Sequence, residues 1–220
     1  MTPSPSSAPR PVINVARLPA SALDHRSPIW WGNLLLLFIE TTMFALMVAA
    51  YFYVRQNYNL WPPPQVNSPF ALLRPVPTLS LPLISLAVLT LSAAPMIWAD
   101  RAALHRREGA VKIAMTLAVI FGGVLIAIRF REFRYLNCRW DDHAYSGIIW
   151  TITGMHLLHL IVGTAENLLL TAWLYLHGMD EKHARDVRVG AVYWYWIVGI
   201  WWILFGVIFY GPRLWPQGQL

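Results

Sequence analysis

Three ionisable side chains interrupt an apolar segment, TGMHLLHLIVGTAE, in the C-terminal half of the chain. At about 100° per residue, His156, His159 and Glu166 fall within an arc of roughly 80° and form one polar stripe on a helix. Ionisable groups within an apolar span are costly, and they usually face protein, water or a bound partner. Two histidines beside an acid could hold a metal ion, a proton or a lipid headgroup, so we expect function along this stripe.

A fourth ionisable group, Glu40, lies in another apolar run, about ten residues after its start at Trp30. At 1.5 Å per residue it sits roughly 15 Å along that helix, near the middle of a membrane. His159 has a comparable depth on its own helix, so the sequence allows the two side chains to meet. Such a pair could serve packing alone. Alternatively, it could belong to a polar patch that binds a lipid headgroup or supports a proton path.

Metal and haem binding by this chain alone are disfavoured. No Cys, Asp or third His on a neighbouring span completes a ligand set for His156 and His159. A haem held by two histidines needs them on two facing helices, and the other five histidines fall in tails or loops. The single cysteine, Cys138, excludes an internal disulfide and a cysteine-ligated cluster. We therefore expect no cofactor in this chain.

The composition places the chain in a membrane. Hydrophobic residues make up 57% of the 220 positions and charged residues 13%, unlike a soluble domain. Each apolar run approaches or exceeds the roughly 20 residues that cross a bilayer, and none alternates as barrel strands do. The sequence predicts an all-α bundle of five transmembrane helices over residues 30–54, 79–98, 111–128, 145–175 and 189–210.

The segments outside these runs predict the topology. Residues 1–28, rich in Pro, Ser and Ala, read as a flexible tail, 29–212 as the transmembrane domain and 213–220 as a C-terminal tail. Ten Lys and Arg fall on the N-terminal side of the spans and seven on the other, which predicts a cytoplasmic N-terminus and an external C-terminus. The pI of about 9.8 is explained by contact with anionic lipids rather than nucleic acid.

Several motifs resemble subunit III of the haem-copper respiratory oxidases, in its short five-helix bacterial form. TGMHLLHLIVGT is similar to the family's TGFHGLHVIIGT, and ETTMFALMVAAYFYVR to its Glu followed by a Phe-rich run that ends in AYFY. LWPPP resembles a Trp-Pro-Pro loop, REF with DDHAYSG resembles a Glu-Tyr and Ala-Tyr-Gly stretch, and AVYWYWIVGIWWILF resembles YWHFVDVVWLF. The resemblance identifies the following positions with family motifs: Glu40, Trp61, Glu132, His156, His159, Tyr193, Trp194 and Trp201.

The resemblance implies a non-catalytic subunit of a proton-pumping terminal oxidase in a bacterial inner membrane. Such a subunit packs on subunit I, accompanies subunit II, binds phospholipid in a cleft and supports proton uptake and stability in aerobic respiration. Haem and copper belong to the partner subunits, and a respiratory supercomplex is a further setting. Glu40 would be the buried glutamate of the family, and Glu132 an extramembrane glutamate near the outer surface.

Two departures keep other readings open. Tyr195 stands where the family has His, and Val198 where it has Asp. The last span therefore loses a polar pair, which allows a divergent branch such as a quinol oxidase subunit or the subunit III-like protein of a nitric oxide reductase. A small stand-alone transporter would use the same polar stripe as a substrate site, but no inverted repeat is evident.

Overall fold

The computed structural model describes residues 28–63 and 76–214, and these contain five helical spans long and apolar enough to cross a membrane. The predicted all-α bundle is confirmed. The predicted N-terminal tail, residues 1–28, lies outside the described residues except for Pro28, which is the first residue of helix α1. Of the predicted C-terminal tail, residues 213–220, the structure describes Arg213 and Leu214. The elements are α1 (Pro28–Arg55), α2 (Ser80–Leu91), α3 (Ala93–Leu104), α4 (Glu108–Glu132), η2 (Phe133–Leu136), α5 (Ala144–His177), α6 (Glu181–Phe205), η3 (Gly206–Tyr210) and α7 (Gly211–Leu214).

The second span is interrupted at Ser92, between α2 and α3. Pro95, three residues on, has no N–H to donate to the preceding turn. The Ser92 hydroxyl donates to the Leu89 carbonyl at 2.6 Å and accepts from Trp194 Nε1 on α6 at 3.0 Å. The break is therefore fixed by a contact with another span.

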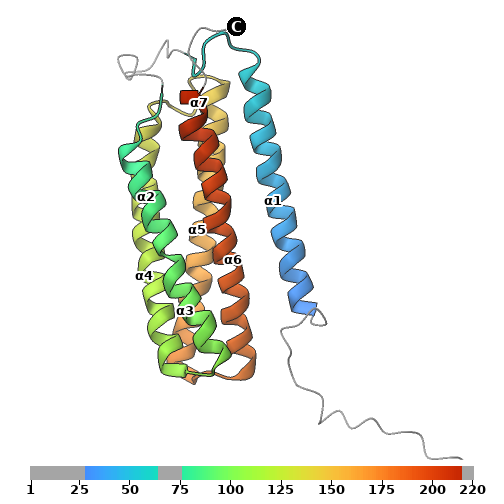
Figure 1. The fold of residues 1–220 in the computed structure, drawn as a ribbon, viewed down its shortest axis with the longest axis vertical. Helices are drawn as coiled ribbons and strands as arrows, with labels where there is room; N and C mark the ends of the chain where they lie inside the picture. The colour runs from blue at the N-terminus through green and yellow to red at the C-terminus, as the bar shows by residue number, and fades with distance from the viewer. Residues whose placement is uncertain (1–27, 64–75, 215–220) are drawn as a thin grey trace, which may run out of the picture.

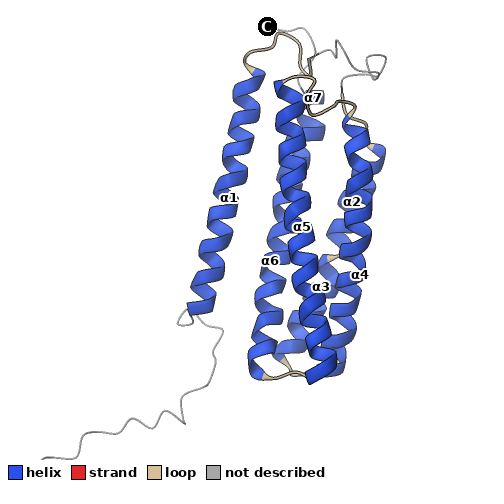
Figure 2. Ribbon diagram, turned by 180° about the vertical axis from the view of Figure 1, so that it is seen from behind, coloured by secondary structure: helices blue, strands red, loops and turns tan. Residues whose placement is uncertain are grey.

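Helix α1 is peripheral, and the remaining spans form the body of the bundle (Figure 1). It packs against α5 and α6, and it diverges from them toward its N-terminal end in both views (Figures 1 and 2). Only 17% of its most apolar stretch is buried, compared with 50% for α5. The position of α1 therefore depends on few contacts within the chain.

The body of the bundle is closely packed where α4 meets α5. A Cβ added at Gly122 would lie 2.4 Å from Thr164 Oγ1 and 3.1 Å from Thr164 Cβ, whereas nothing lies within 4 Å at Gly123. Thr164 itself is held by a 2.7 Å hydrogen bond to the Leu160 carbonyl. Gly122 thus permits a close approach of the two helices.

The first turn of α5 is closed by His143. Its Nδ1 accepts from the backbone N–H of Ser146 at 3.1 Å, and Ser146 Oγ accepts from the backbone N–H of His143 at 3.0 Å, which is a reciprocal capping box. Partial burial lowers the pKa of the His143 imidazole below its ordinary value of 6.5. The neutral ring is the form that can accept this bond.

Candidate functional site

Glu40 on α1 and His159 on α5 are in direct contact. Glu40 Oε2 lies 2.8 Å from His159 Nε2, across 119 positions of sequence. The ring is flanked by Phe44 and Trp196, with centroid distances of 5.3 and 5.5 Å. The contact that the sequence allowed between these two side chains is thus present in the fold.

The second ring nitrogen determines how many protons the pair holds. His159 Nδ1 lies 2.6 Å from the Met155 carbonyl oxygen. Since a carbonyl can only accept, Nδ1 carries a proton. The Nε2 to Oε2 contact then contains one further proton, on either the imidazole or the carboxyl. In both arrangements the pair has zero net charge, which lowers its cost within a membrane.

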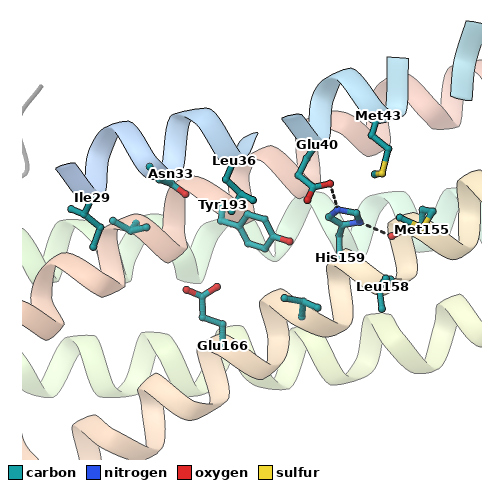
Figure 3. Close-up of a pocket in the computed structure, with 13 residues that line it drawn as sticks. Ile29, Asn33, Leu36, Glu40, Met43, Met155, Leu158, His159, Glu166 and Tyr193 are labelled. Atoms are coloured by element: carbon teal, nitrogen blue, oxygen red, sulfur yellow. Dashed lines mark hydrogen bonds and ion pairs between the residues drawn. The ribbon is translucent and has the colours of Figure 1, made fainter. Parts of the chain in front are cut away.

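A cavity of about 560 Å³ opens beside this pair, between α1, α5 and α6. Figure 3 shows Glu40 and Glu166 directed into it, with the Tyr193 ring between them. Most of its wall is apolar, and the side chains of Leu36, Leu158 and Val162 are also exposed on the outside of the bundle. The lining consists of Ile29, Gly32, Asn33, Leu36, Glu40, Met43, Met155, Leu158, His159, Val162, Glu166, Val189 and Tyr193. This is a shape suited to acyl chains with a polar group at one end.

The predicted stripe is divided between two environments. His159 and Glu166 line the cavity, but His156 points into the body of the bundle and is fully buried. His156 Nε2 donates to the Ile197 carbonyl on α6 at 3.1 Å, and its ring lies on Trp201 with centroids 4.4 Å apart. His156 Nδ1 has no hydrogen-bond partner among the described residues. The two histidines therefore do not converge on a common point.

A buried ion pair was missed by the sequence analysis. Arg129 Nη1 lies 2.6 Å from Glu132 Oε2, and both side chains are 1% exposed. The Arg129 guanidinium also lies over the Trp201 ring at 3.6 Å. The predicted span ended at Ile128 and left Arg129 in a loop, but α4 continues to Glu132. The signal was the i, i+3 spacing of opposite charges beside an apolar run.

The other member of this ion pair, Glu132, lies at a helix end. It is the last residue of α4, close to the end of a span, but its side chain is enclosed by protein.

The tryptophans of the family motifs are packing groups, and two of them have hydrogen-bond partners. Trp61 is buried and donates from Nε1 to the Tyr51 hydroxyl at 3.0 Å. Trp194 donates to Ser92, and Trp201 lies between Arg129 and His156. Val198, at the departure from the family pattern, is a buried apolar residue.

The described residues contain no group of three or more His, Cys, Asp or Glu side chains that could hold a metal ion. Cys138 is buried and separate from the histidines, and burial raises the pKa of its thiol to about 12. The arrangement can bind an amphiphile and hold a proton.

Comparison with known proteins identifies similar chains. The profile of the family described as cytochrome c oxidase subunit III matches residues 21–213. The chain is 25% identical to cytochrome c oxidase subunit 3 of Heterololigo bleekeri over 184 residues, covering 81% of this chain and 68% of that protein. It is 28% identical to that of Prototheca wickerhamii over 203 residues and 26% identical to that of Petromyzon marinus over 197 residues, in each case covering 84% of this chain and 72% of the relative.

Proposed function

Because this chain belongs to the cytochrome c oxidase subunit III family, we propose that it serves its oxidase complex without a redox centre of its own. Haem and copper would reside in subunits I and II, with this chain packed on subunit I. The engagement of the histidines supports this. His159 is bonded through both ring nitrogens, and His156 through Nε2 to a backbone carbonyl. Ligation of a metal by either Nε2 would require breaking these contacts.

The second part of the proposal is that phospholipid occupies the cavity between α1, α5 and α6. The single observation that carries it is the apolar wall of a 560 Å³ space that opens between transmembrane helices. Water there would face mainly Leu, Met, Val and Ile side chains, so acyl chains are the favoured filling. A lipid in this position would also support α1, which has few other contacts.

The third part concerns protons and durability. The Glu40 and His159 pair holds one shared proton at a site that adjoins the cavity. We infer that it supports proton uptake by the complex and its stability during turnover, while oxygen reduction occurs elsewhere. A bacterial inner membrane with a cytoplasmic N-terminus fits the charge distribution. Arg129 is buried in an ion pair, so it no longer counts among the basic residues of the external loops. The numbers of Lys and Arg on the cytoplasmic and external sides then become ten and six.

A second candidate concerns the electron donor. Tyr195 and Val198 replace the polar pair that the family carries on the last span. These departures favour a divergent branch, in which the complex is a quinol oxidase or a nitric oxide reductase. The chemistry of the donor belongs to the partner chains in each case.

Gentle detergent purification of the full-length chain tests the proposal. We expect a large haem-bearing chain and a copper-bearing chain to copurify, and haem absorption to remain with them after separation. A Soret band that stays with this chain would overturn the absence of a redox centre. A reporter fused after Leu220 should be active outside the membrane. A reporter at this position that is active only on the cytoplasmic side would overturn the orientation.

A further inference from the structure

Glu166 is a carboxylate without a hydrogen-bond or ion-pair partner among the described residues, although it lies on a membrane span. It is exposed within the cavity. The carboxylate of Asp186 on α6 acts on it as a like charge. A carboxylate in this setting needs a cation or a hydrogen-bond donor from outside the described residues.

The depth of Glu166 is that of a lipid headgroup boundary. Helix α5 has 34 residues, or about 51 Å at 1.5 Å per residue, roughly 20 Å more than the hydrocarbon core. Glu166 lies eleven residues before its end at His177, about 16 Å along the axis. If α5 projects equally on both sides, Glu166 lies about 6 Å inside the core boundary, within reach of the interface for an extended side chain.

A hydrogen-bond donor lies on the opposite wall. Asn33 on α1 lines the same cavity, is 8% exposed, and has a buried Nδ2 without a hydrogen-bond partner. Figure 3 shows it across the cavity from Glu166. A buried amide nitrogen left unbonded is costly. The cavity thus presents one unused negative charge, and a flip of the Asn33 amide would turn its unbonded, buried donor toward the same space.

The charges of the lining disfavour an anionic ligand. Within residues 28–63 and 76–214, no Lys or Arg lines the cavity, and Glu40 and His159 neutralise each other. An anionic headgroup would meet Glu166 with no compensating cation. A zwitterionic headgroup has a phosphate that can accept from Asn33 and an ammonium that can donate to Glu166.

We propose that the cavity selects phospholipids with an ammonium headgroup, and that Glu166 is the residue that binds the ammonium. The inference rests on the proposed lipid-binding role and adds the chemical class of the lipid. The phosphate lies at Asn33, and an acyl chain extends along Leu36, Met43 and Leu158 toward the Glu40 and His159 pair.

The test measures which lipids the full-length chain retains. The chain, with the chains that copurify, is placed in nanodiscs of equimolar dioleoyl phosphatidylethanolamine and dioleoyl phosphatidylglycerol, extracted, washed and weighed by native mass spectrometry. Four proteins are compared: the unaltered chain, Glu166→Gln, Glu166→Lys, and Glu108→Gln as a control. Glu108 is an exposed acid at the same end of the bundle, outside the cavity, and pairs with Lys112.

We expect the unaltered chain and Glu108→Gln to retain phosphatidylethanolamine over phosphatidylglycerol by about fivefold, which corresponds to about 1 kcal/mol. Glu166→Gln should retain the same amount of lipid without this preference, and Glu166→Lys should reverse it. Retention of lipid with a preference that Glu166→Gln leaves unchanged would overturn the inference but not lipid binding.

Failure of the proposed function has a different signature. If the unaltered chain retains no lipid, the lipid-binding role itself is wrong. A photo-reactive residue that replaces Val162, in the cavity wall, identifies what occupies the cavity by cross-linking to it. Cross-linking to lipid supports the lipid-binding role and leaves the headgroup preference to the comparison of variants, whereas cross-linking to another polypeptide overturns both proposals.

Discussion

Arg129 and Glu132 form an ion pair inside the membrane bundle, with Nη1 and Oε2 separated by 2.6 Å and both side chains 1% exposed. The guanidinium also lies over the face of Trp201 at 3.6 Å, a cation–π contact. Two opposite charges one helical turn apart therefore stabilise each other where water has no access.

The first prediction is that removing one partner of this buried ion pair destabilises the fold far more than removing one partner of an exposed ion pair. Glu132→Gln or Arg129→Gln should lower the free energy of unfolding by about 3–5 kcal/mol, since the remaining charge stays buried. Unfolding of the full-length chain in mild detergent by increasing SDS measures this.

Arg106→Gln is the matched control, because Arg106 forms a 2.6 Å ion pair with Glu181 that is largely exposed. It should change stability by less than about 1 kcal/mol. Equal effects at the two pairs would show that burial does not determine the cost.

The second prediction concerns Glu40 and His159. Glu40→Gln, His159→Gln and the double variant should be non-additive in stability, with a coupling of about 0.5–3 kcal/mol, because the 2.8 Å contact is lost in either single variant. Oxygen consumption by the complex should begin at the normal rate and then decline faster. Additive stabilities would argue against the contact, and an immediate loss of turnover would place chemistry in this chain.

The third prediction uses two adjacent glycines on α4. Gly122→Ala should destabilise the chain by about 1–3 kcal/mol, because the added methyl group overlaps Thr164 and the helices must separate. Gly123→Ala has open space and should leave stability unchanged or slightly higher. Thermal unfolding of both variants in the same detergent provides the comparison, and a reversed order would contradict the packing of α4 on α5.

The fourth prediction is a pH dependence from the first turn of α5. Burial lowers the pKa of His143 in the folded chain below the 6.5 of an unfolded chain. As pH falls through 6.5, the unfolded chain therefore takes up a proton first, and the stability of the fold decreases until the folded pKa is reached. Protonation of Nδ1 also removes the acceptor for the Ser146 N–H.

The measurement is the thermal unfolding midpoint between about pH 8 and pH 5. His143→Asn keeps a capping acceptor but does not titrate, so its midpoint should fall less over this range than that of the unaltered chain. Parallel curves would show that His143 does not contribute to acid sensitivity.

The position of a residue along its helix could be predicted from the sequence more readily than the direction in which its side chain points around the helix. The spans fix the height of each residue, and this was sufficient to bring Glu40 and His159 together. The polar stripe, in contrast, was expected to act as one surface. His156 and Glu166 differ by enough rotation that one faces α6 and the other the cavity, and only the positions of the neighbouring helices reveal which.

Charge was the other source of error. Arg129 was assigned to a loop because the apolar run ends at Ile128, and its burial is compensated by Glu132 and Trp201. The spacing of Arg129 and Glu132 could have indicated their ion pair, but no local pattern connects Arg129 with Trp201 on α6. The close packing at Gly122 could not be predicted from the sequence either, because it depends on the position of Thr164 on the neighbouring helix.

The partner of His156 has a consequence for how this protein can change over evolutionary time. His156 donates to the main-chain oxygen of Ile197, and every residue type provides such an oxygen at that position. Mutational drift at position 197 can therefore alter packing without removing the acceptor, and a saturation library there should retain function across many side chains. The contact between Glu40 and His159 is different, because it joins two side chains and is lost when either residue changes alone. These two positions are therefore expected to change together or not at all.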